Sequence, residues 1–138
     1  METVLLFCHH AETDAEGRLS LTGVFHELYA PDFPASQDRA VLAGSIEWSR
    51  AEAGRKTFRI DLNDPDGDSI YTIEGHSDVD ERSDDRAPAR TQLILPLNNL
   101  VFGAPGRYRV EVAIDDRKIA GPSLHLLRTH ADETTSNL

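Results

Sequence analysis

The sequence predicts an all-β fold, a sandwich of two antiparallel sheets with about eight or nine strands. Short apolar segments recur along the 138 residues, separated by clusters of Gly, Pro, Asp and Asn. No stretch repeats apolar residues at the spacing of three and four that marks one face of a helix. Alternating strands joined by tight turns are typical of a sandwich, and a barrel is the main alternative.

The first expected strand, residues 3–9, is apolar at consecutive positions, which indicates a strand covered on both faces. Residues 18–28 form the second strand, in which Gly23 is typical of a bulge or a bend. Residues 29–38 contain two prolines, so we expect them to run as a connection over one end of the fold.

The middle of the chain predicts a further strand and a hairpin. Residues 39–48 form the strand, and Trp48 is in phase with its apolar face, which makes it a core residue. Residues 56–63 and 69–74 form the hairpin. The turn 64–67 between them reads Asp-Pro-Asp-Gly, in which Pro presets φ and Gly adopts a positive φ.

The last third of the chain is expected to hold the remaining strands. Residues 90–95 form a strand closed by Pro96, and residues 97–102 form a corner that tucks apolar side chains under a loop. Residues 118–128 form the final strand of a single domain, 1–128. The polar residues 129–138 are expected to be a disordered tail.

The clearest alternation in the chain follows Pro105 and Gly106. We expect the apolar residues of this strand to face the core and the charged residues between them to face solvent; the apolar set is Tyr108, Val110, Val112 and Ile114. The order Pro-Gly-x-Tyr is similar to the tyrosine corner of immunoglobulin-like sandwiches, in which the phenol binds nearby backbone. The predicted fold is therefore an immunoglobulin-like sandwich.

The acidity of the chain is local. The formal net charge is −10, and residues 61–85 contain ten acids and one base. Residues 77–89 lack apolar anchors and are expected to form a mobile loop. An acidic surface of this kind steers a basic protein partner by its field, and a solvated loop is the simpler alternative. The candidate partner-binding residues are Asp78, Asp80, Glu81, Asp84 and Asp85.

Composition excludes several classes of protein. A strongly acidic chain is not expected to bind nucleic acid. Cys8 is the only cysteine, which excludes an intramolecular disulfide and a zinc site built from several thiolates. The first apolar run is too short for a secretion signal or a membrane span, so we expect a cytoplasmic protein with no membrane contact.

A calcium site is the second hypothesis. Four aspartates crowd the expected hairpin turn, and Ca²⁺ prefers several oxygen ligands. Their spacing does not fit the helical calcium-binding loop, but two Asp-rich loops, 61–68 and 78–85, are together able to supply ligands at the end of a sandwich. The four candidate metal ligands are Asp61, Asp64, Asp66 and Asp68.

Catalysis is disfavoured by the motifs. The sequence has no nucleophile elbow and no glycine-rich phosphate loop. Cys8 lies within an apolar strand and is expected to be a buried, unreactive thiol. Its neighbours His9 and His10 point to opposite faces of a strand, so at most one of them can join a metal cluster. We expect no cofactor, and an enzyme with an unrecognised site remains a third hypothesis.

The order of three motifs resembles a bacterial family of small β-sandwich proteins catalogued as a domain of unknown function. The motifs are Gly-Arg-Leu-Ser-Leu-Thr-Gly at 17–23, Ala-Pro-Asp-Phe-Pro at 30–34 and Pro-Gly-x-Tyr at 105–108. The final turn departs from the pattern, because Arg117 stands where the family has glycine. The resemblance implies a small sandwich of immunoglobulin-like character and no catalytic or binding residue.

The leading functional hypothesis is a non-enzymatic binding module. Its acidic loop would bind another protein, for example as an inhibitor or immunity-type protein that masks a basic active site. A homodimer is also open, because the apolar first strand and the uncovered sheet edges invite pairing with a second copy.

Overall fold

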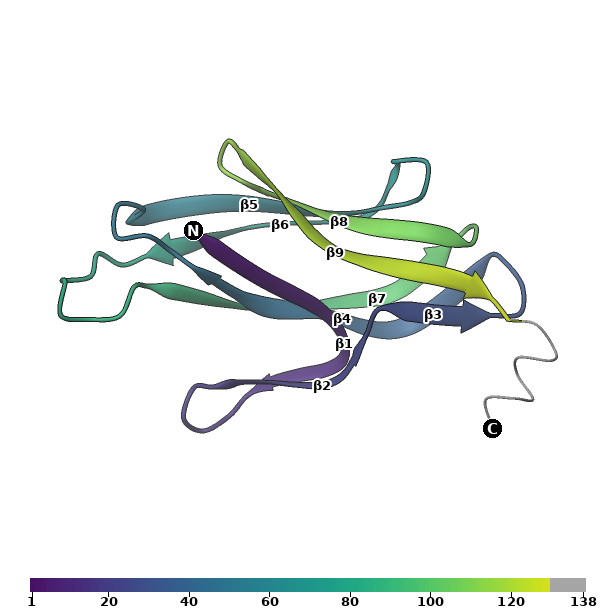
Figure 1. The fold of residues 1–138 in the computed structure, drawn as a ribbon, viewed down its shortest axis with the longest axis horizontal. Helices are drawn as coiled ribbons and strands as arrows, with labels where there is room; N and C mark the ends of the chain where they lie inside the picture. The colour runs from purple at the N-terminus through teal and green to yellow at the C-terminus, as the bar shows by residue number, and fades with distance from the viewer. Residues whose placement is uncertain (130–138) are drawn as a thin grey trace.

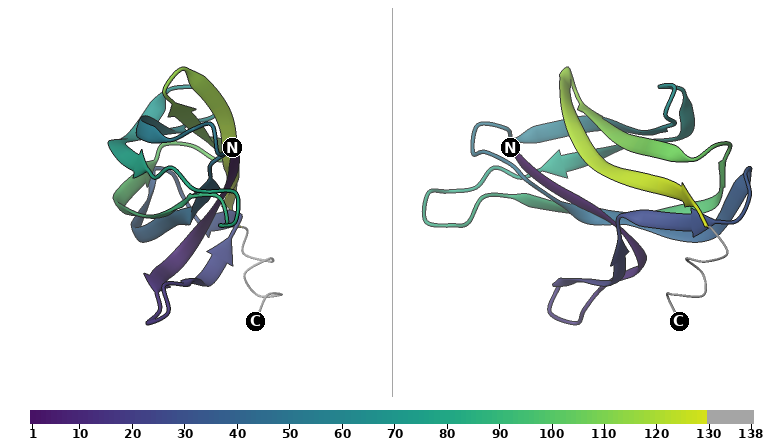
Figure 2. Two further views of the ribbon diagram at one scale, coloured as in Figure 1. Left: turned by 90° about the vertical axis from the view of Figure 1, so that its left-hand side faces the viewer. Right: turned by 45° about the vertical axis from the view of Figure 1, so that its right-hand side comes forward.

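The computed structural model describes residues 1–129 and forms two sheets that face each other (Figure 1). Within that range every regular element is a β-strand, so the all-β prediction is confirmed. Figure 2 shows the hairpin of the first two strands projecting beyond the layered sheets. The nine strands are β1 Glu2–Thr13, β2 Leu19–Phe25, β3 Glu27–Ala30, β4 Ala35–Glu47, β5 Gly54–Asn63, β6 Ser69–Val79, β7 Arg90–Phe102, β8 Gly106–Ile114 and β9 Arg117–Arg128.

Sheet A has four strands in the order β2-β1-β4-β7, and sheet B has five in the order β3-β9-β8-β5-β6. All pairs in the two sheets are antiparallel except β3 with β9, which is parallel. The fully antiparallel sandwich of the sequence prediction is therefore wrong at this one pair. The chain leaves sheet A after β2 and joins the edge of sheet B, where it runs in the direction of β9.

The core lies between the sheets and follows the predicted alternation. In β8, the four apolar residues Tyr108, Val110, Val112 and Ile114 are all at most 4% exposed, which confirms the predicted inward face. Trp48 is also buried, as predicted. Burial of these large side chains supplies most of the free energy that favours folding.

Strand β7 is longer than predicted and continues through Pro96. It pairs with β4 from Arg90 to Phe102, with Pro96 opposite Val41. This is possible because β7 is the edge strand of sheet A, where a residue without an N–H group breaks no pairing with a second neighbour. The predicted corner at 97–102 is therefore wrong. These residues continue the strand, and Leu97, Leu100 and Phe102 are buried within it.

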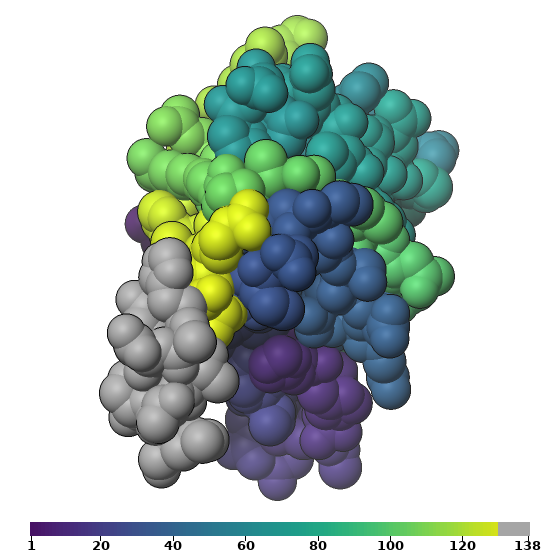
Figure 3. All heavy atoms as spheres, turned by 90° about the vertical axis from the view of Figure 1, so that its right-hand side faces the viewer, coloured from purple at the N-terminus to yellow at the C-terminus, as the bar shows by residue number. Residues whose placement is uncertain are grey.

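The expected connection at 29–38 is also shorter than predicted. The structure places strand residues up to Ala30 and again from Ala35, so only residues 31–34 connect them. Hydrogen bonds hold β3 at the edge of sheet B: the His125 N–H donates to the His26 carbonyl, and the Thr129 N–H donates to the Ala30 carbonyl, both at 2.9 Å. Figure 3 shows this blue segment beside the end of β9. Beyond Thr129, the predicted tail lies outside the described residues.

Gly23 adopts a left-handed backbone conformation in β2, with φ of 70°. A Cβ atom here would lie 2.7 Å from Cδ2 of His9, so a side chain has neither the conformation nor the space. The pairing of β1 with β2 keeps its register on both sides of Gly23. The predicted irregularity is thus a local bend without an inserted residue.

Tyr108 closes one end of the core. Its hydroxyl donates to the carbonyl of Ala104 at 2.7 Å, as a tyrosine corner does. Its ring meets Phe102 edge-on, with the two ring centroids 5.0 Å apart. The buried phenol thus has a polar partner and links β8 of sheet B to β7 of sheet A.

The Tyr108→Phe substitution should lower the free energy of unfolding by about 1 kcal/mol, because it removes the hydrogen bond that the hydroxyl donates to the Ala104 carbonyl and the longer one, 3.4 Å, that it accepts from the Ala104 N–H. Urea unfolding followed by tryptophan fluorescence measures this change. The control is Tyr71→Phe, since the half-buried Tyr71 hydroxyl has no hydrogen-bond partner within residues 1–129. Equal stability of the two variants would show that the Tyr108 hydrogen bond contributes nothing.

Candidate functional site

The loop 80–89 crosses from β6 of sheet B to β7 of sheet A. Both ends of this crossing are anchored, because Val79 and Ala89 are buried. The Trp48 N–H also donates to the Ala89 carbonyl at 2.9 Å. The expectation of a loop without apolar anchors is therefore wrong, since the loop is short and its ends pack under the sheets. All five predicted partner-binding acids are exposed.

Arg50 holds the loop by its backbone. Its guanidinium donates to the Ser83 carbonyl at 2.6 Å and to the Arg86 carbonyl at 2.5 Å. The Arg86 N–H donates in turn to the Ser83 carbonyl at 3.1 Å, which closes a turn. Because a guanidinium carries several donors in a fixed plane, it is able to bind both carbonyls at once. The loop is thus braced by a residue of the segment that follows β4.

The carboxylates of the loop remain available. Arg50 Nε lies 4.0 Å from Asp84 Oδ1, a distant contact to a fully exposed side chain. Asp85 accepts a short hydrogen bond from the Ser83 hydroxyl. Asp80 and Glu81 have no side-chain partner within the described part of the chain. The carboxylates of this loop therefore face solvent, and close ion pairs with the described residues do not neutralise them.

The surface is less acidic than the sequence count suggests. Residues 78–86 contain five acids, but Arg82 and Arg86 lie in the same segment. Arg55 stands opposite Asp78 in the pairing of β5 with β6. The sum over this segment is −3, so its field is weaker than the acid count suggests, and salt at physiological concentration screens it over about 8 Å.

The Asp64 side chain holds the 64–68 turn of the hairpin together. Asp64 Oδ1 accepts from the backbone N–H groups of Asp66 at 3.0 Å and Asp68 at 2.9 Å. The Gly67 N–H donates to the Asp64 carbonyl at 2.9 Å, and Gly67 has the predicted positive φ. Asp64 thus acts as a side-chain mimic of a backbone turn.

Asp61 lies on the outer surface of β5 in a network of hydrogen bonds. Its carboxylate accepts from the hydroxyls of Thr72 at 2.6 Å and Ser69 at 3.1 Å, and from Arg59 Nε at 3.0 Å. Partial burial raises the pKa of Asp61, but these donors outweigh burial and the net shift is downward. Asp61 is therefore ionised at neutral pH and bound to three donors within the protein.

The two acidic segments do not meet. The turn 64–68 precedes β6 and the loop 80–89 follows it, and a strand of eleven residues spans about 36 Å. A calcium site that combines both segments is therefore wrong. Among residues 1–129, no three His, Cys, Asp or Glu side chains gather at one point. The four hairpin aspartates are among these residues, so a calcium site formed by them alone stays a prediction that this arrangement of side chains does not support.

Cys8 is buried as predicted, with no exposed surface. Burial raises the pKa of its thiol, which keeps it protonated at neutral pH. The ring of His9 packs against Phe25, with 4.8 Å between the ring centroids. His10 lies 3.6 Å from Glu12 at the surface. These neighbours thus make separate contacts, as the strand geometry predicted.

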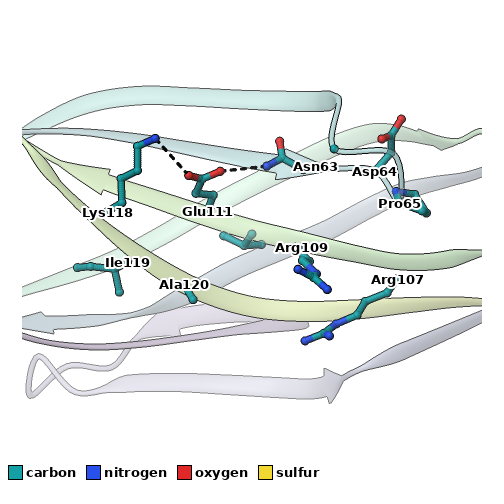
Figure 4. A pocket seen from close by; sticks show the side chains of 11 residues that line it. Asn63, Asp64, Pro65, Arg107, Arg109, Glu111, Lys118, Ile119 and Ala120 are labelled. Atoms are coloured by element: carbon teal, nitrogen blue, oxygen red, sulfur yellow. Dashed lines mark hydrogen bonds and ion pairs between the residues drawn. The ribbon is translucent and has the colours of Figure 1, made fainter.

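The structure also contains a groove that the sequence did not indicate (Figure 4). It has a volume of about 650 Å³ and lies on the outer side of sheet B, where the pairing of β8 with β9 shifts near Val110. Gly121 approaches Val110 so closely that a Cβ atom would lie 2.7 Å from its Cγ1. A glycine and a proline in the middle of the last strand, at 121–122, were the available signal for this irregularity.

The groove combines apolar and charged walls. Glu111 is held by Asn63 at 3.3 Å and by Lys118 at 3.9 Å, as Figure 4 shows. Arg107 donates to the Ser123 hydroxyl at 2.9 Å. Arg109 lines the groove and makes no ion pair or side-chain hydrogen bond with any residue up to Thr129. One guanidinium is therefore free to bind an anion.

The fold and these surfaces define a two-sheet β-protein with a braced acidic loop and an open groove. The chain matches the family of unknown function DUF6941 over residues 3–127 and belongs to that family. The match confirms the resemblance to a family of unknown function that the three sequence motifs indicated. A comparison with curated proteins found no match. No helix in residues 1–129 is long and apolar enough to cross a membrane.

The Asp61→Asn substitution should lower the free energy of unfolding at pH 7 by about 1–2 kcal/mol, because Asn loses the charge that Arg59 and two hydroxyls bind. The lowered pKa of Asp61 stabilises the folded protein above the ordinary carboxyl pKa of about 4, and this stabilisation is lost as the pH falls below that value. Urea titrations at several pH values should therefore show that the free energy of unfolding falls less steeply below about pH 4 for the variant than for the wild type.

Asp66→Asn is the matched control in the same hairpin, because only the backbone of Asp66 makes a hydrogen bond there. Its stability should equal that of the wild type at every pH. An identical decrease of stability at acid pH for Asp61→Asn and the wild type would contradict the structural role of Asp61.

Proposed function

We propose that the protein is a cytoplasmic binding module, and not an enzyme, that docks a basic protein partner on the loop 80–89 and the adjoining Asp78. The observation that carries this proposal is the brace by Arg50. The Arg50 guanidinium donates to two backbone carbonyls of the loop and not to its carboxylates. The loop therefore keeps its shape while the carboxylates face solvent. A preformed charged surface loses less conformational entropy on binding than a mobile one.

The chemistry of the loop favours a partner with arginine or lysine side chains. Carboxylates that have few partners of their own are able to form charge-assisted hydrogen bonds with a guanidinium. Nearby opposite charges also accelerate encounter, and salt weakens this effect. An inhibitor or immunity-type protein that masks a basic active site is one specific form of the proposal.

Two further features belong to the same proposal. The fold is assigned to the immunoglobulin-like sandwiches on the support of the Tyr108 hydroxyl bond to the Ala104 carbonyl. The source is taken to be bacterial, as the motif resemblance implies.

Replacing all five acids with their amides should abolish binding without loss of stability. The variant is Asp78→Asn, Asp80→Asn, Glu81→Gln, Asp84→Asn and Asp85→Asn. Affinity capture from a lysate of the source organism, at rising salt, compares the variant with the wild type. A partner retained at low salt, released by salt and absent with the variant supports the proposal.

The control removes the same charge elsewhere on the surface, at Glu12, Asp38, Asp66, Asp68 and Asp116. It should capture the partner as the wild type does. A second variant, Arg50→Gln, keeps all five acids but frees the loop backbone, so it should bind more weakly and exchange the amide hydrogens of 80–89 faster. Equal capture by the wild type and the five-amide variant would contradict the proposal.

A small anionic ligand in the groove is the second candidate function. The Arg109 guanidinium, which has no partner in residues 1–129, lies in a groove whose apolar lining includes Pro65 and Ala120, and this favours a ligand with an anionic group on an apolar body. The calcium alternative has less support, because Asp64 and Asp61 already accept several hydrogen bonds within the protein.

Titration with an anilinonaphthalene sulfonate, an aromatic anion, tests the groove. Its fluorescence should rise on binding to the wild type, and Arg109→Gln should weaken binding about tenfold or more, the effect of losing one charge-assisted hydrogen bond. Arg55→Gln, on the same sheet outside the groove lining, is the control and should bind as the wild type does. Equal affinities for all three proteins would contradict an anion site at Arg109.

A further inference from the structure

Sheet A is apolar on the side that faces away from the core. Directly paired residues of antiparallel strands point to the same side of a sheet, so the registers of β1, β4 and β7 align apolar residues in rows. One row contains Leu6, Ala43 and Ile94, and the next contains Cys8, Val41 and Pro96. These six residues form the outer apolar face of sheet A, and Val4 and Val24 lie at its margins.

Burial separates this face from the core. Cys8 and Ala43 are small and have no exposed surface, yet neither belongs to the cluster of side chains packed between the sheets. Their larger neighbours are exposed: 59% for Val4, 44% for Val24 and 36% for Ile94. A contiguous apolar surface of this kind usually marks an interface.

The outer side of sheet B has the opposite character. Arg59 pairs with Glu74 and Asp61 pairs with Glu111 across its strands, so charged residues face solvent there. Antiparallel sheets normally have one apolar face and one polar face. Sheet B follows this rule, and sheet A does not.

Opposite charges flank the outer apolar face along β4. Arg39 and Glu47 lie four residues before and four residues after Ala43, so both point to the same side as Ala43. Arg39 has no charged partner in the described residues. Glu47 binds Arg90 at 3.3 Å. Glu2 lies opposite Glu47 in the pairing of β1 with β4 and makes no ion pair with the described residues, so it adds a second negative charge at that end.

This arrangement is complementary to itself. A two-fold axis along the row of Leu6, Ala43 and Ile94 reverses the strands of a second copy. The apolar rows then face each other, and Arg39 of one copy comes against Glu47 of the other. An isologous interface requires self-complementarity of this kind, and face-to-face sheets pack their side chains at a separation of about 10 Å.

We propose that the outer apolar face of sheet A binds a second copy of this chain, in a two-fold dimer with Ala43 on the axis. The contact is between faces of sheets and does not use the open strand edges. It covers Val4 and Ile94 and supplies the charged partner that Arg39 lacks in residues 1–129.

Sedimentation equilibrium tests the dimer. The wild type should have twice the 15.3 kDa mass of one chain. Ile94→Lys places two like charges at the axis and should give 15.3 kDa, with an unchanged circular dichroism spectrum. The matched control is Leu127→Lys on β9 of sheet B, where Leu127 is 37% exposed, and it should remain dimeric.

Charge reversal tests the orientation and does not disturb the apolar residues. Arg39→Glu should raise the dimer dissociation constant at least about tenfold, because it opposes Glu47 of the second copy. Adding Glu47→Arg to the same chain should restore dimerisation.

Three results would overturn the proposal. The first is a wild-type mass of 15.3 kDa, which would leave a different protein as the occupant of the face. The second is a folded Ile94→Lys variant that stays dimeric. The third is an Arg39→Glu variant that dimerises as well as the wild type, a result that does not depend on how Ile94→Lys folds.

Discussion

The indole N–H of Trp48 donates to the hydroxyl of Thr91 at 2.8 Å, and the same hydroxyl lies 2.8 Å from the Ser77 hydroxyl. Trp48 follows β4, Thr91 belongs to β7, and Ser77 belongs to β6 of the other sheet. These contacts join the two sheets at the end where the acidic loop crosses. Because the buried indole has a polar partner, its large apolar surface packs in the core without an unsatisfied donor.

The position of the loop 80–89 depends on this closure. The backbone of Trp48 holds Ala89 at one end of the loop, and Arg50, two residues beyond Trp48, binds carbonyls in its middle. The loop is therefore attached to the core through one short segment of chain. A surface that is fixed in this way is suited to recognition, since its shape exists before the partner arrives.

The outer sides of the two sheets differ in chemical character. Sheet B exposes charged side chains and a groove, whereas sheet A exposes an apolar face with opposite charges beside it. Sheet A has apolar residues on both of its faces. The opening strand β1 is therefore apolar at consecutive positions, because alternate residues point into the core and to the outer apolar face. A second copy on the outer side would complete the burial that this pattern implies.

Local patterns in the sequence were sufficient to predict an all-β chain and much of the core, but residues 18–28, predicted as one strand, form two strands in different sheets, β2 and β3. The alternation in 108–114, the Asp-Pro-Asp-Gly turn and the hydrogen bond of the Tyr108 hydroxyl to nearby backbone each depend on neighbours within a few residues, and each was predicted correctly. The exposed state of the five loop acids was also predictable, because charged residues between strands seldom bury.

Long-range contacts decided the rest. Pro96 stays within a strand only because β7 is an edge, and the parallel pair of β3 with β9 depends on where the chain crosses between sheets. The separation of the two acidic segments follows from the length of β6, and the brace of Arg50 joins residues 33 and 36 positions apart. The sequence alone determined which residues turn, alternate and carry charge. The tertiary structure decided which of them meet, because strand order and sheet packing bring together side chains that have no proximity in sequence.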